Sequence, residues 1–264
     1  MGTTDVVGFV GLGQMGSPMA SHLVSWPGGL VVCDARAEAR DILADRGAQV
    51  ARTPADVAGL AHVVSVMLLD DEQVKEVVLG PDGILAARRE GLVIGLHSTI
   101  HPTTAERLAE LCGPRGVAVV DAPVSGGSVG AREGRLAVMV GGDDEAVERC
   151  RGPFGMWAEL FVHTGPVGSG TRAKLAGDLV HHVSRAAVVE AQRLAAAAGI
   201  SLDDLVRVVR HSDAITSWHD TTAHGRDVGT QDLLLVLKVG HELGVDLPLA
   251  RVALDGLAAD PPRS

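Results

Sequence analysis

The chain has 264 residues, of which 46% are hydrophobic and 21% are charged, so it can form one large domain or two smaller ones. Its formal net charge of −10 argues against a nucleic-acid partner, because binding to phosphates requires a basic surface. Tyrosine is absent, which excludes any mechanism that depends on a catalytic tyrosine.

The distribution of apolar residues and cysteines predicts a cytoplasmic protein. The first apolar run turns into glycines at Gly11, too early for a secretory signal, and no uncharged run approaches the roughly 20 residues that span a bilayer. Three widely spaced cysteines, Cys33, Cys112 and Cys150, fit buried thiols in a reducing compartment better than disulfides or a zinc site. We therefore expect no membrane partner and no metal.

A glycine triplet, Gly11, Gly13 and Gly16, separates the first apolar run from a helix-like segment. A second apolar run then ends in Asp34, about 20 residues after the glycines. Strand, glycine turn, helix, strand and acid in this order are typical of a dinucleotide site. Gly11 permits the tight turn, Gly13 lets the backbone approach a pyrophosphate, and Gly16 lets helix and strand pack closely.

The residues between and after these glycines complete the predicted cofactor site. Leu12, Gln14 and Met15 form the rest of the loop, and the following helix N-terminus offers amide donors to the phosphates. Asp34 is either an ordinary acid at a strand end or the acceptor for the adenosine ribose, which would favour NAD over NADP. Arg36 could bind a 2′-phosphate, so NADP remains the alternative.

Strands and helices continue to alternate as far as residue 164, which predicts a Rossmann-type α/β domain with a doubly wound, mainly parallel sheet. The expected strands are 61–69, 91–100 and 116–127, the expected helices are 70–80 and 101–113, and a last strand–helix–strand covers 135–150 and 159–165.

From Gly168 onward the strand pattern disappears, and an all-α domain opened by a long helix is expected. The alanine-rich, proline-free segment that ends at Gly199 predicts about 30 residues of continuous helix. We place the cofactor domain at 1–164 and the helical domain at 165–264. Further helices are expected at 201–210, with Ser201 as the N-cap, and at 231–244 and 247–258, after an irregular polar segment at 211–230.

Five segments resemble the β-hydroxyacid dehydrogenase family, which includes 3-hydroxyisobutyrate dehydrogenase and 6-phosphogluconate dehydrogenase. They are "GFVGLGQMGSPMA", "STIHPTT", "DAPVSGGSVGAREGRLAVMVGG", "GPVGSGTRAKLAGD" and "QDLLLVLKVGHELGVDLPL". The resemblance covers nearly the whole chain. It implies an NAD(P)-dependent oxidoreductase that transfers hydride between nicotinamide and a small hydroxyacid, semialdehyde or related carbonyl.

The resemblance also implies roles for individual residues. Lys174 would be the catalytic acid/base, which hydride transfer requires for the hydroxyl proton. Ser125, Gly126 and Gly127 would bind the substrate carboxylate, as amide-rich turns can, although the same residues could form a plain turn. Three further residues would line the cofactor site: Leu68, Leu69 and Thr99.

Histidines offer few alternatives to Lys174 as the proton handler. His97 and His101 flank the "STI" segment, where a lactate dehydrogenase-type histidine mechanism would need a carboxylate partner, and neither is favoured. His181 and His182 follow Lys174 along the long helix and are expected to line the cleft or a subunit contact rather than bind a metal.

Three positions depart from the family pattern. Asp178 stands where the family has asparagine, Gly177 stands where it has asparagine or histidine, and Gln231 replaces a lysine expected to face the substrate. On a helix, Asp178 lies one turn after Lys174 and is expected to favour its ammonium form, a poorer base but a competent acid. We therefore expect reduction of a carbonyl or imine to be favoured over oxidation of an acidic alcohol.

These departures leave two alternatives open: an imine reductase-like enzyme, and a catalytically weak dinucleotide-binding protein that acts as a sensor or in assembly. The long alanine-rich helix has more apolar surface than one small bundle can cover. A homodimer or homotetramer that uses the helical domain is therefore expected, as the resemblance also implies.

Overall fold

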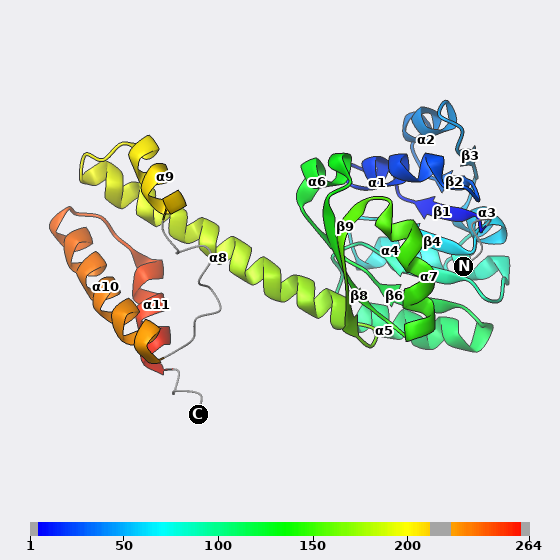
Figure 1. Cartoon of the computed structure of the whole chain (residues 1–264). Helices are drawn as coiled ribbons and strands as arrows, with labels where there is room; N and C mark the ends of the chain where they lie inside the picture. Colours follow the sequence, from blue (N-terminus) through cyan, green and yellow to red (C-terminus); the bar gives the residue numbers. More distant parts are fainter. Residues whose placement is uncertain (1–4, 212–222, 260–264) are drawn as a thin grey trace. The chain divides into compact units, whose positions relative to one another are not determined.

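The computed structural model describes residues 5–211 and 223–259. The chain forms two compact units, residues 1–177 and 178–264, and the division falls within one long helix (Figure 1). The predicted domain boundary, between residues 164 and 165, falls at the last residue of the strand Ala158–Gly165. It remains a prediction. No helix in the described ranges is both long and apolar enough to cross a membrane.

The first unit is built on one sheet whose strand order is β3-β2-β1-β4-β5-β6-β8-β7, with β9 paired to β8. The strands from β3 to β6 are parallel, β8 is antiparallel to β6, and β9 is parallel to β8, which confirms the mainly parallel sheet. The strands are β1 (Val7–Val10), β2 (Leu30–Cys33), β3 (Gln49–Val50), β4 (Val63–Val66), β5 (Val93–Leu96), β6 (Ala118–Asp121), β7 (Val124–Ser125), β8 (Leu136–Gly141) and β9 (Ala158–Gly165).

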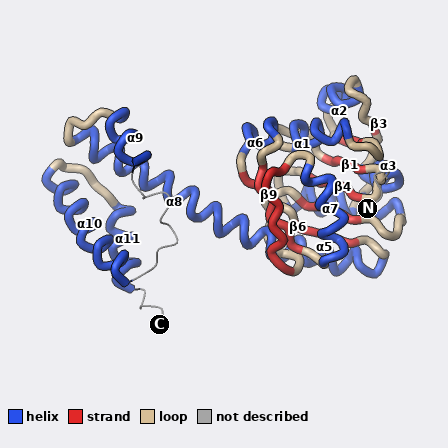
Figure 2. Tube along the Cα trace, viewed as in Figure 1, coloured by secondary structure: helices blue, strands red, loops and turns tan. Residues whose placement is uncertain are grey.

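Helices cover both faces of this sheet, as Figure 2 shows. Side chains alternate along each strand, so Phe9 of β1 enters one apolar core and Val10 enters the other. The first core includes residues of α1, α2, α6 and α7, and the second includes residues of α3, α4 and α5. The helices are α1 (Gly16–His22), α2 (Ala37–Ala44), α3 (Pro54–Leu60), α4 (Asp71–Leu79), α5 (Pro102–Cys112), α6 (Gly127–Glu133) and α7 (Asp144–Gly155), with short 3₁₀ turns η1 (Leu23–Ser25), η2 (Ile84–Ala87) and η3 (Gly113–Arg115).

The segment between Asp34 and residue 61 holds α2, β3 and α3, for which the strand–helix alternation made no prediction. A local signal for α3 is present in the sequence. The Thr53 hydroxyl accepts a hydrogen bond from the Asp56 N–H at 3.0 Å, and the Asp56 carboxylate accepts one from the Thr53 N–H at 3.1 Å. Pro54 follows at the first helical position, so the start of α3 is fully capped.

The long helix α8 (Ser169–Ala197) has 29 residues and confirms the predicted helix of about 30. Three helices follow it: α9 (Leu202–His211), α10 (Ala223–Glu242) and α11 (Pro248–Ala259). The Ser201 hydroxyl accepts a hydrogen bond from the Asp204 N–H at 3.1 Å, which confirms Ser201 as a cap.

The start of α10 differs from the prediction. Residues 223–230 were expected to be irregular, but α10 includes them, while 212–222 lie outside the described residues. Gly225 and Gly229 lower the intrinsic helix propensity of this stretch by about 1 kcal/mol each relative to alanine. Extending an existing helix costs far less than starting one, so the helix continues through them.

Candidate functional site

The order in which successive strands are added to the sheet reverses between β1 and β4. Strands β2 and β3 lie on one side of β1, and β4 begins the series on its other side. Loops that leave the carboxyl ends of two such strands diverge and leave a crevice, the usual ligand site of this sheet type. A cavity of about 810 Å³ lies there. Its lining consists of Val10, Gly11, Gly13, Gln14, Met15, Gly16, Cys33, Asp34, Ala35, Arg36, Arg52, Pro54, Met67, Leu68, Leu69, Gln73 and Val77.

Each of the three glycines of the loop lacks a Cβ for a different structural reason. Gly11 has a φ of 92°, and a Cβ there would overlap the carbonyl oxygen of Met67. A Cβ at Gly16 would overlap the carbonyl oxygen of Gly11. At Gly13, by contrast, a Cβ would meet no protein atom within 4 Å, although the residue lines the cavity. Gly13 therefore keeps open a space that the protein itself does not fill.

The Asp34 carboxylate lies at the end of β2 and organises the loop. Its Oδ2 accepts a hydrogen bond from the Leu12 N–H at 2.6 Å, and its Oδ1 accepts bonds from the Arg36 N–H at 2.8 Å and Nε at 3.1 Å. Burial by itself would raise the pKa of Asp34, but these donors outweigh burial and hold the pKa below its usual value. Asp34 is therefore held as a carboxylate.

Arg36 bridges two parts of the site. Its Nη2 donates a hydrogen bond to the Leu12 carbonyl at 2.8 Å while its Nε pairs with Asp34. The guanidinium is mostly exposed, with 60% of the side chain accessible, so it can leave this position at small cost. Arg52 is a second cation in the cavity lining. It was not predicted from the sequence, because no local motif indicates that it belongs to the site.

Two predicted cofactor residues lie outside the cavity lining. Leu12 is 2% exposed and takes part only through its backbone, as described above. Thr99 is exposed and follows β5 by three residues. Beside it, the Ser98 hydroxyl accepts a hydrogen bond from the Leu68 N–H at 2.8 Å and so ties the loop after β5 to the loop after β4.

His97 is buried beneath these loops and does not face the cavity. Its Nδ1–H donates to the Ala122 carbonyl at 2.8 Å, and its Nε2 accepts from the Ser65 hydroxyl at 2.9 Å. The rings of Phe154 and Trp157 contact it edge-on. Burial lowers the pKa of His97 to about 4. The neutral His97 ring, with both nitrogens hydrogen-bonded, links the ends of β4, β5 and β6. It is therefore expected to be structural and not to exchange protons with a substrate.

The predicted substrate segment follows β6. Ser125 ends β7 and is exposed, as are Gly126 and Gly127. The two glycines have φ values of 123° and 62°, conformations that residues with a Cβ rarely adopt. This turn therefore requires glycine, and it leaves the Ser125 side chain accessible beside the start of α6.

The start of α8 is attached to the sheet by Asp121, the last residue of β6. Asp121 Oδ1 accepts a hydrogen bond from the Gly168 N–H, and Oδ2 accepts one from the Thr171 N–H, both at 2.6 Å. Lys174 lies one helical turn beyond Thr171 and is partly buried. The sequence reasoning did not identify Asp121, because its partners are 47 and 50 residues away.

The remaining predicted residues are distributed over both units. Lys174 belongs to the first unit, whereas Asp178 and Gln231 belong to the second. Asp178 follows Lys174 by four residues on α8, and Gln231 is exposed on α10. The described cavity is thus lined by nine of the eleven predicted cofactor residues, without Leu12 and Thr99. It includes neither the Ser125 segment nor the predicted catalytic pair.

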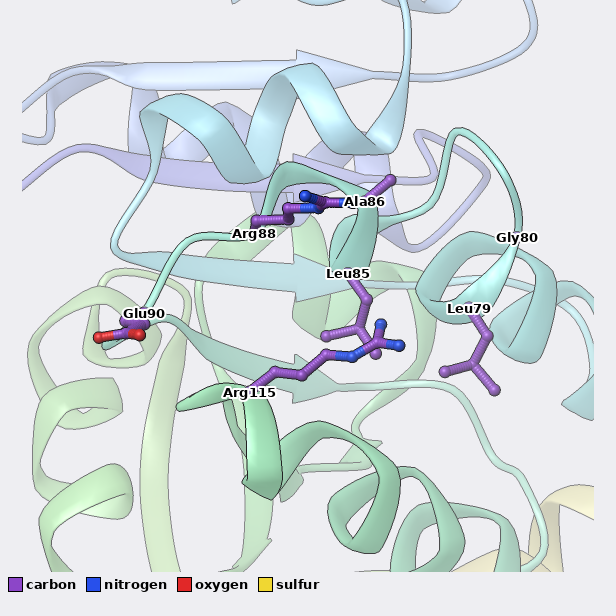
Figure 3. A pocket seen from close by; sticks show the side chains of 7 residues that line it. All are labelled: Leu79, Gly80, Leu85, Ala86, Arg88, Glu90 and Arg115. Atoms are coloured by element: carbon purple, nitrogen blue, oxygen red, sulfur yellow. The ribbon is translucent and has the colours of Figure 1, made fainter.

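A second cavity, of about 580 Å³, lies at the opposite edge of the sheet, among the loops that lead into β5 and β6 (Figure 3). None of the predicted site residues lines it. Its lining consists of Leu79, Gly80, Leu85, Ala86, Arg88, Glu90 and Arg115.

Residues 6–165 match the family described as the NAD binding domain of 6-phosphogluconate dehydrogenase. The chain belongs to the β-hydroxyacid dehydrogenase family. The match covers the sheet, the glycine loop and Asp34, which confirms both the predicted family and the Rossmann-type fold. As a member of this family, the protein is an NAD(P)-dependent dehydrogenase or reductase that acts on CH–OH groups.

Relatives of this family member support the family assignment over almost the whole chain. An uncharacterized oxidoreductase of Mycobacterium tuberculosis is 46% identical over 275 aligned residues, covering 97% of this chain and 93% of the relative. The NAD-dependent L-serine dehydrogenase of Pseudomonas aeruginosa is 38% identical, covering 78% of this chain and 69% of the relative. The crystal structure of a putative oxidoreductase from Mycobacterium avium has a TM-score of 0.85 and 44% identity, covering 96% and 97% of the two chains.

The cavity fits the dinucleotide that the family binds. The open space at Gly13 admits a pyrophosphate next to the backbone, and the Asp34 carboxylate lies where the adenosine ribose is expected. When bound, the nicotinamide ring supplies the hydride acceptor or donor. The protein would hold the cofactor through the glycine loop and Asp34, with apolar contacts from Leu68 and Leu69.

Proposed function

We propose that this enzyme transfers hydride between NAD(H) and a small β-hydroxyacid or its carbonyl counterpart, with Lys174 as the acid/base. The observation that carries the proposal is the cavity at the carboxyl edge of the sheet, built from the glycine loop and a charged Asp34. In oxidation, the hydride leaves the carbinol carbon and the Lys174 amine takes the hydroxyl proton. In reduction, the Lys174 ammonium returns a proton to the carbonyl oxygen.

The substrate class follows from the residues proposed to bind it. Ser125 offers a hydroxyl, and the two glycines after it offer an exposed turn without side chains, which suits a carboxylate. Serine is itself a β-hydroxyacid, and the L-serine dehydrogenase relative supports small substrates of this size. Compared with the family pattern, Asp178 adds a negative charge on α8 and Gln231 removes a positive charge. Both changes disfavour the binding and oxidation of an anionic hydroxyacid. We therefore propose that carbonyl reduction is the favoured direction.

NAD is the proposed cofactor, with NADP as a weaker one. The Asp34 carboxylate would accept hydrogen bonds from the ribose hydroxyls and repel a 2′-phosphate. Arg36 and Arg52 line the same cavity and give the adenosine end two cations. A small residual affinity for NADP is therefore expected.

We also propose a homodimer or homotetramer that forms through α8, in the cytoplasm. Six large apolar side chains of the helix are at least 43% exposed: Leu175, Leu179, Val180, Val183, Val188 and Val189. Association would remove this surface from water. Sedimentation of wild type and Leu179→Asp tests this, since a wild-type monomer would contradict it. The cytoplasmic placement rests on the three free buried cysteines.

The test of the function is a turnover screen with both cofactors at high enzyme concentration. The substrates are L-serine, 3-hydroxyisobutyrate, their semialdehydes and a cyclic imine, with NADH binding measured in parallel by fluorescence. The proposal requires turnover of at least one hydroxyacid or semialdehyde, and faster turnover with NAD(H) than with NADP(H). Tight NADH binding without any turnover would instead indicate the catalytically weak binding protein, and turnover of the imine alone would indicate an imine reductase.

A further inference from the structure

The buried carboxylate of Asp121 connects the two segments that the proposed function assigns to the substrate. Asp121 ends β6 and is 0% exposed, and the strand leads within four residues to Ser125. Its two oxygens accept the Gly168 and Thr171 amides, each at 2.6 Å, at the start of the helix that carries Lys174. A carboxylate from another element thus occupies the place that an N-cap side chain normally takes.

The backbone around Asp121 is packed so closely that only glycine fits. A Cβ at Gly141 would overlap Asp121 Oδ1, and a Cβ at Gly170 would overlap the carbonyl oxygens of Met139 and Asp121. The first turn of α8 therefore rests directly on β6 and β8, without intervening side chains. This packing explains why the approach to Lys174 needs a glycine at 170.

The helix start is consequently fixed in translation and rotation. Lys174 lies three residues after Thr171, about 4.5 Å further along the helix axis. A change in the position of the Thr171 amide moves the Lys174 side chain with it, because one rigid turn of helix joins them.

Hydrogen bonds also fix the backbone that follows Asp121 toward Ser125. The Ala122 carbonyl accepts from the His97 ring at 2.8 Å, and the Pro123 carbonyl accepts from the Met139 N–H at 3.2 Å. The two residues after Asp121 therefore cannot adjust independently on the way to Ser125. Asp121 is the point at which the substrate segment and the lysine helix share one support.

We infer that Asp121 is a positioning residue for catalysis, which sets the place of Lys174 relative to the substrate-binding segment at 125–127. The inference rests on the proposed roles of Lys174 and Ser125. Proton transfer needs its two heavy atoms within hydrogen-bond reach, so a shift of about 1 Å at the helix start lowers turnover steeply. Cofactor binding through the glycine loop is separate from this support and is not affected.

A matched control exists in the second unit. Glu190 is 7% exposed, and its two oxygens accept the Leu249 N–H at 2.7 Å and the Ala250 N–H at 3.1 Å at the start of α11. Glu190 therefore makes the same kind of contact as Asp121, a buried carboxylate at a helix start. Glu190 lies on α8, 16 residues after Lys174, but the helix that it caps, α11, carries no proposed catalytic residue.

The experiment compares Asp121→Asn with Glu190→Gln. The asparagine turns an NH₂ group toward one backbone donor and loses that hydrogen bond. We expect both variants to lose thermal stability, but only Asp121→Asn to lower kcat, by at least about tenfold, with NADH affinity unchanged and a larger solvent isotope effect. Amide hydrogen exchange in residues 168–174 should accelerate in Asp121→Asn alone. Equal kcat in both variants, or a loss of NADH affinity that parallels the loss of kcat, would overturn the inference.

Two further variants keep the outcome decisive. If Asp121→Asn does not fold, Gly168→Ala disturbs one of the same hydrogen bonds from the helix side and carries the same expectations. The alanine is strained at the φ of 89°, and the atoms nearest to its Cβ are the ends of the Arg172 and Glu106 side chains. In a Lys174→Ala background, Asp121→Asn should cause no further loss of kcat, because it acts through the lysine. A loss that persists there overturns this inference alone, whereas full activity of Lys174→Ala overturns the proposed function.

Discussion

The Asp34 carboxylate accepts a hydrogen bond from the Leu12 N–H at 2.6 Å, so the end of β2 is tied directly to the middle of the glycine loop. The residue proposed to bind the ribose therefore also shapes the loop that would bind the phosphates. A second contact, from Arg36 to the same carboxylate, partly neutralises it. The proposed selection of NAD and the conformation of the loop therefore involve the same side chain.

For Asp34→Asn we expect kcat/KM for NAD to fall at least about tenfold, because a charged acceptor contributes roughly 1.5–3 kcal/mol to a hydrogen bond. Without the carboxylate, Arg36 is released and can bind a 2′-phosphate, so kcat/KM for NADP should rise. Steady-state kinetics with both cofactors measures this change in preference. Arg36→Ala is the matched variant and should lose the residual NADP activity. An unchanged NAD/NADP ratio in Asp34→Asn would contradict the assignment.

The open space at Gly13 gives a prediction that separates binding from folding. Gly13→Ala adds a methyl group that meets no protein atom within 4 Å, so its melting temperature should stay near that of wild type. The methyl group would enter the space reserved for the pyrophosphate, and NADH affinity should fall at least about tenfold.

Two other glycines serve as controls for Gly13→Ala. Gly16→Ala should lose both stability and NADH affinity, because its Cβ overlaps the Gly11 carbonyl oxygen. Gly59→Ala adds a methyl group in open space on α3, away from the cavity lining, and should bind NADH normally. Thermal melts with NADH titrations compare all three. Normal NADH binding by Gly13→Ala would mean that the phosphates lie elsewhere.

Buried His97 makes the stability of the enzyme depend on pH. Burial holds its pKa at about 4, while the unfolded chain binds a proton near pH 6.5. Between these values the unfolded state binds more protons than the folded state, so the free energy of unfolding falls as the pH falls. The contribution is fully present above about pH 6.5, and about 2 kcal/mol of it is lost at pH 5.

His97→Gln keeps a donor for the Ala122 carbonyl and an acceptor for the Ser65 hydroxyl but does not titrate. Urea denaturation at pH 7 and pH 5 should therefore show a smaller pH-dependent loss of stability in this variant than in wild type. The other ten histidines are common to both proteins and cancel in the comparison. Parallel pH profiles of the two proteins would show that His97 is protonated in the folded state.

Asp178→Asn restores the residue that the family pattern has after Lys174 and removes one negative charge from α8. An anionic hydroxyacid should then bind better, with a KM lower by roughly threefold to tenfold, and oxidation should gain on reduction. Kinetics in both directions with a panel of β-hydroxyacids measures this change. If wild type oxidises the panel as well as Asp178→Asn does, the proposed preference for reduction is wrong.

Local patterns were sufficient to predict that the glycine loop and Asp34 meet, as they do in the lining of the cavity. The glycine triplet and Asp34 are close in sequence, and their spacing reflects one strand–turn–helix–strand unit. The extent of α8 was also predictable, since a proline-free run rich in alanine has only one favourable conformation over such a length. The role of Lys174, by contrast, was predicted only from the resemblance and stays a prediction, because nothing in its local sequence distinguishes it from an exposed helix lysine.

Contacts between distant segments could not be predicted in this way. Asp121 was not singled out because its significance depends on two amides about fifty residues away. Arg52 enters the cavity lining from the loop before α3, a region where the alternation of strands and helices gave no signal. Both residues became visible only when the folded chain placed them beside their partners.

The most direct test of the account is Lys174→Ala, measured by turnover together with NADH binding. We predict that the NADH dissociation constant stays within about twofold of the wild-type value, since the cavity lining does not include Lys174. Turnover of the best substrate should fall at least about 100-fold, the lower range for loss of a general acid or base. Turnover equal to that of wild type, with normal NADH binding, would contradict the proposed role of Lys174.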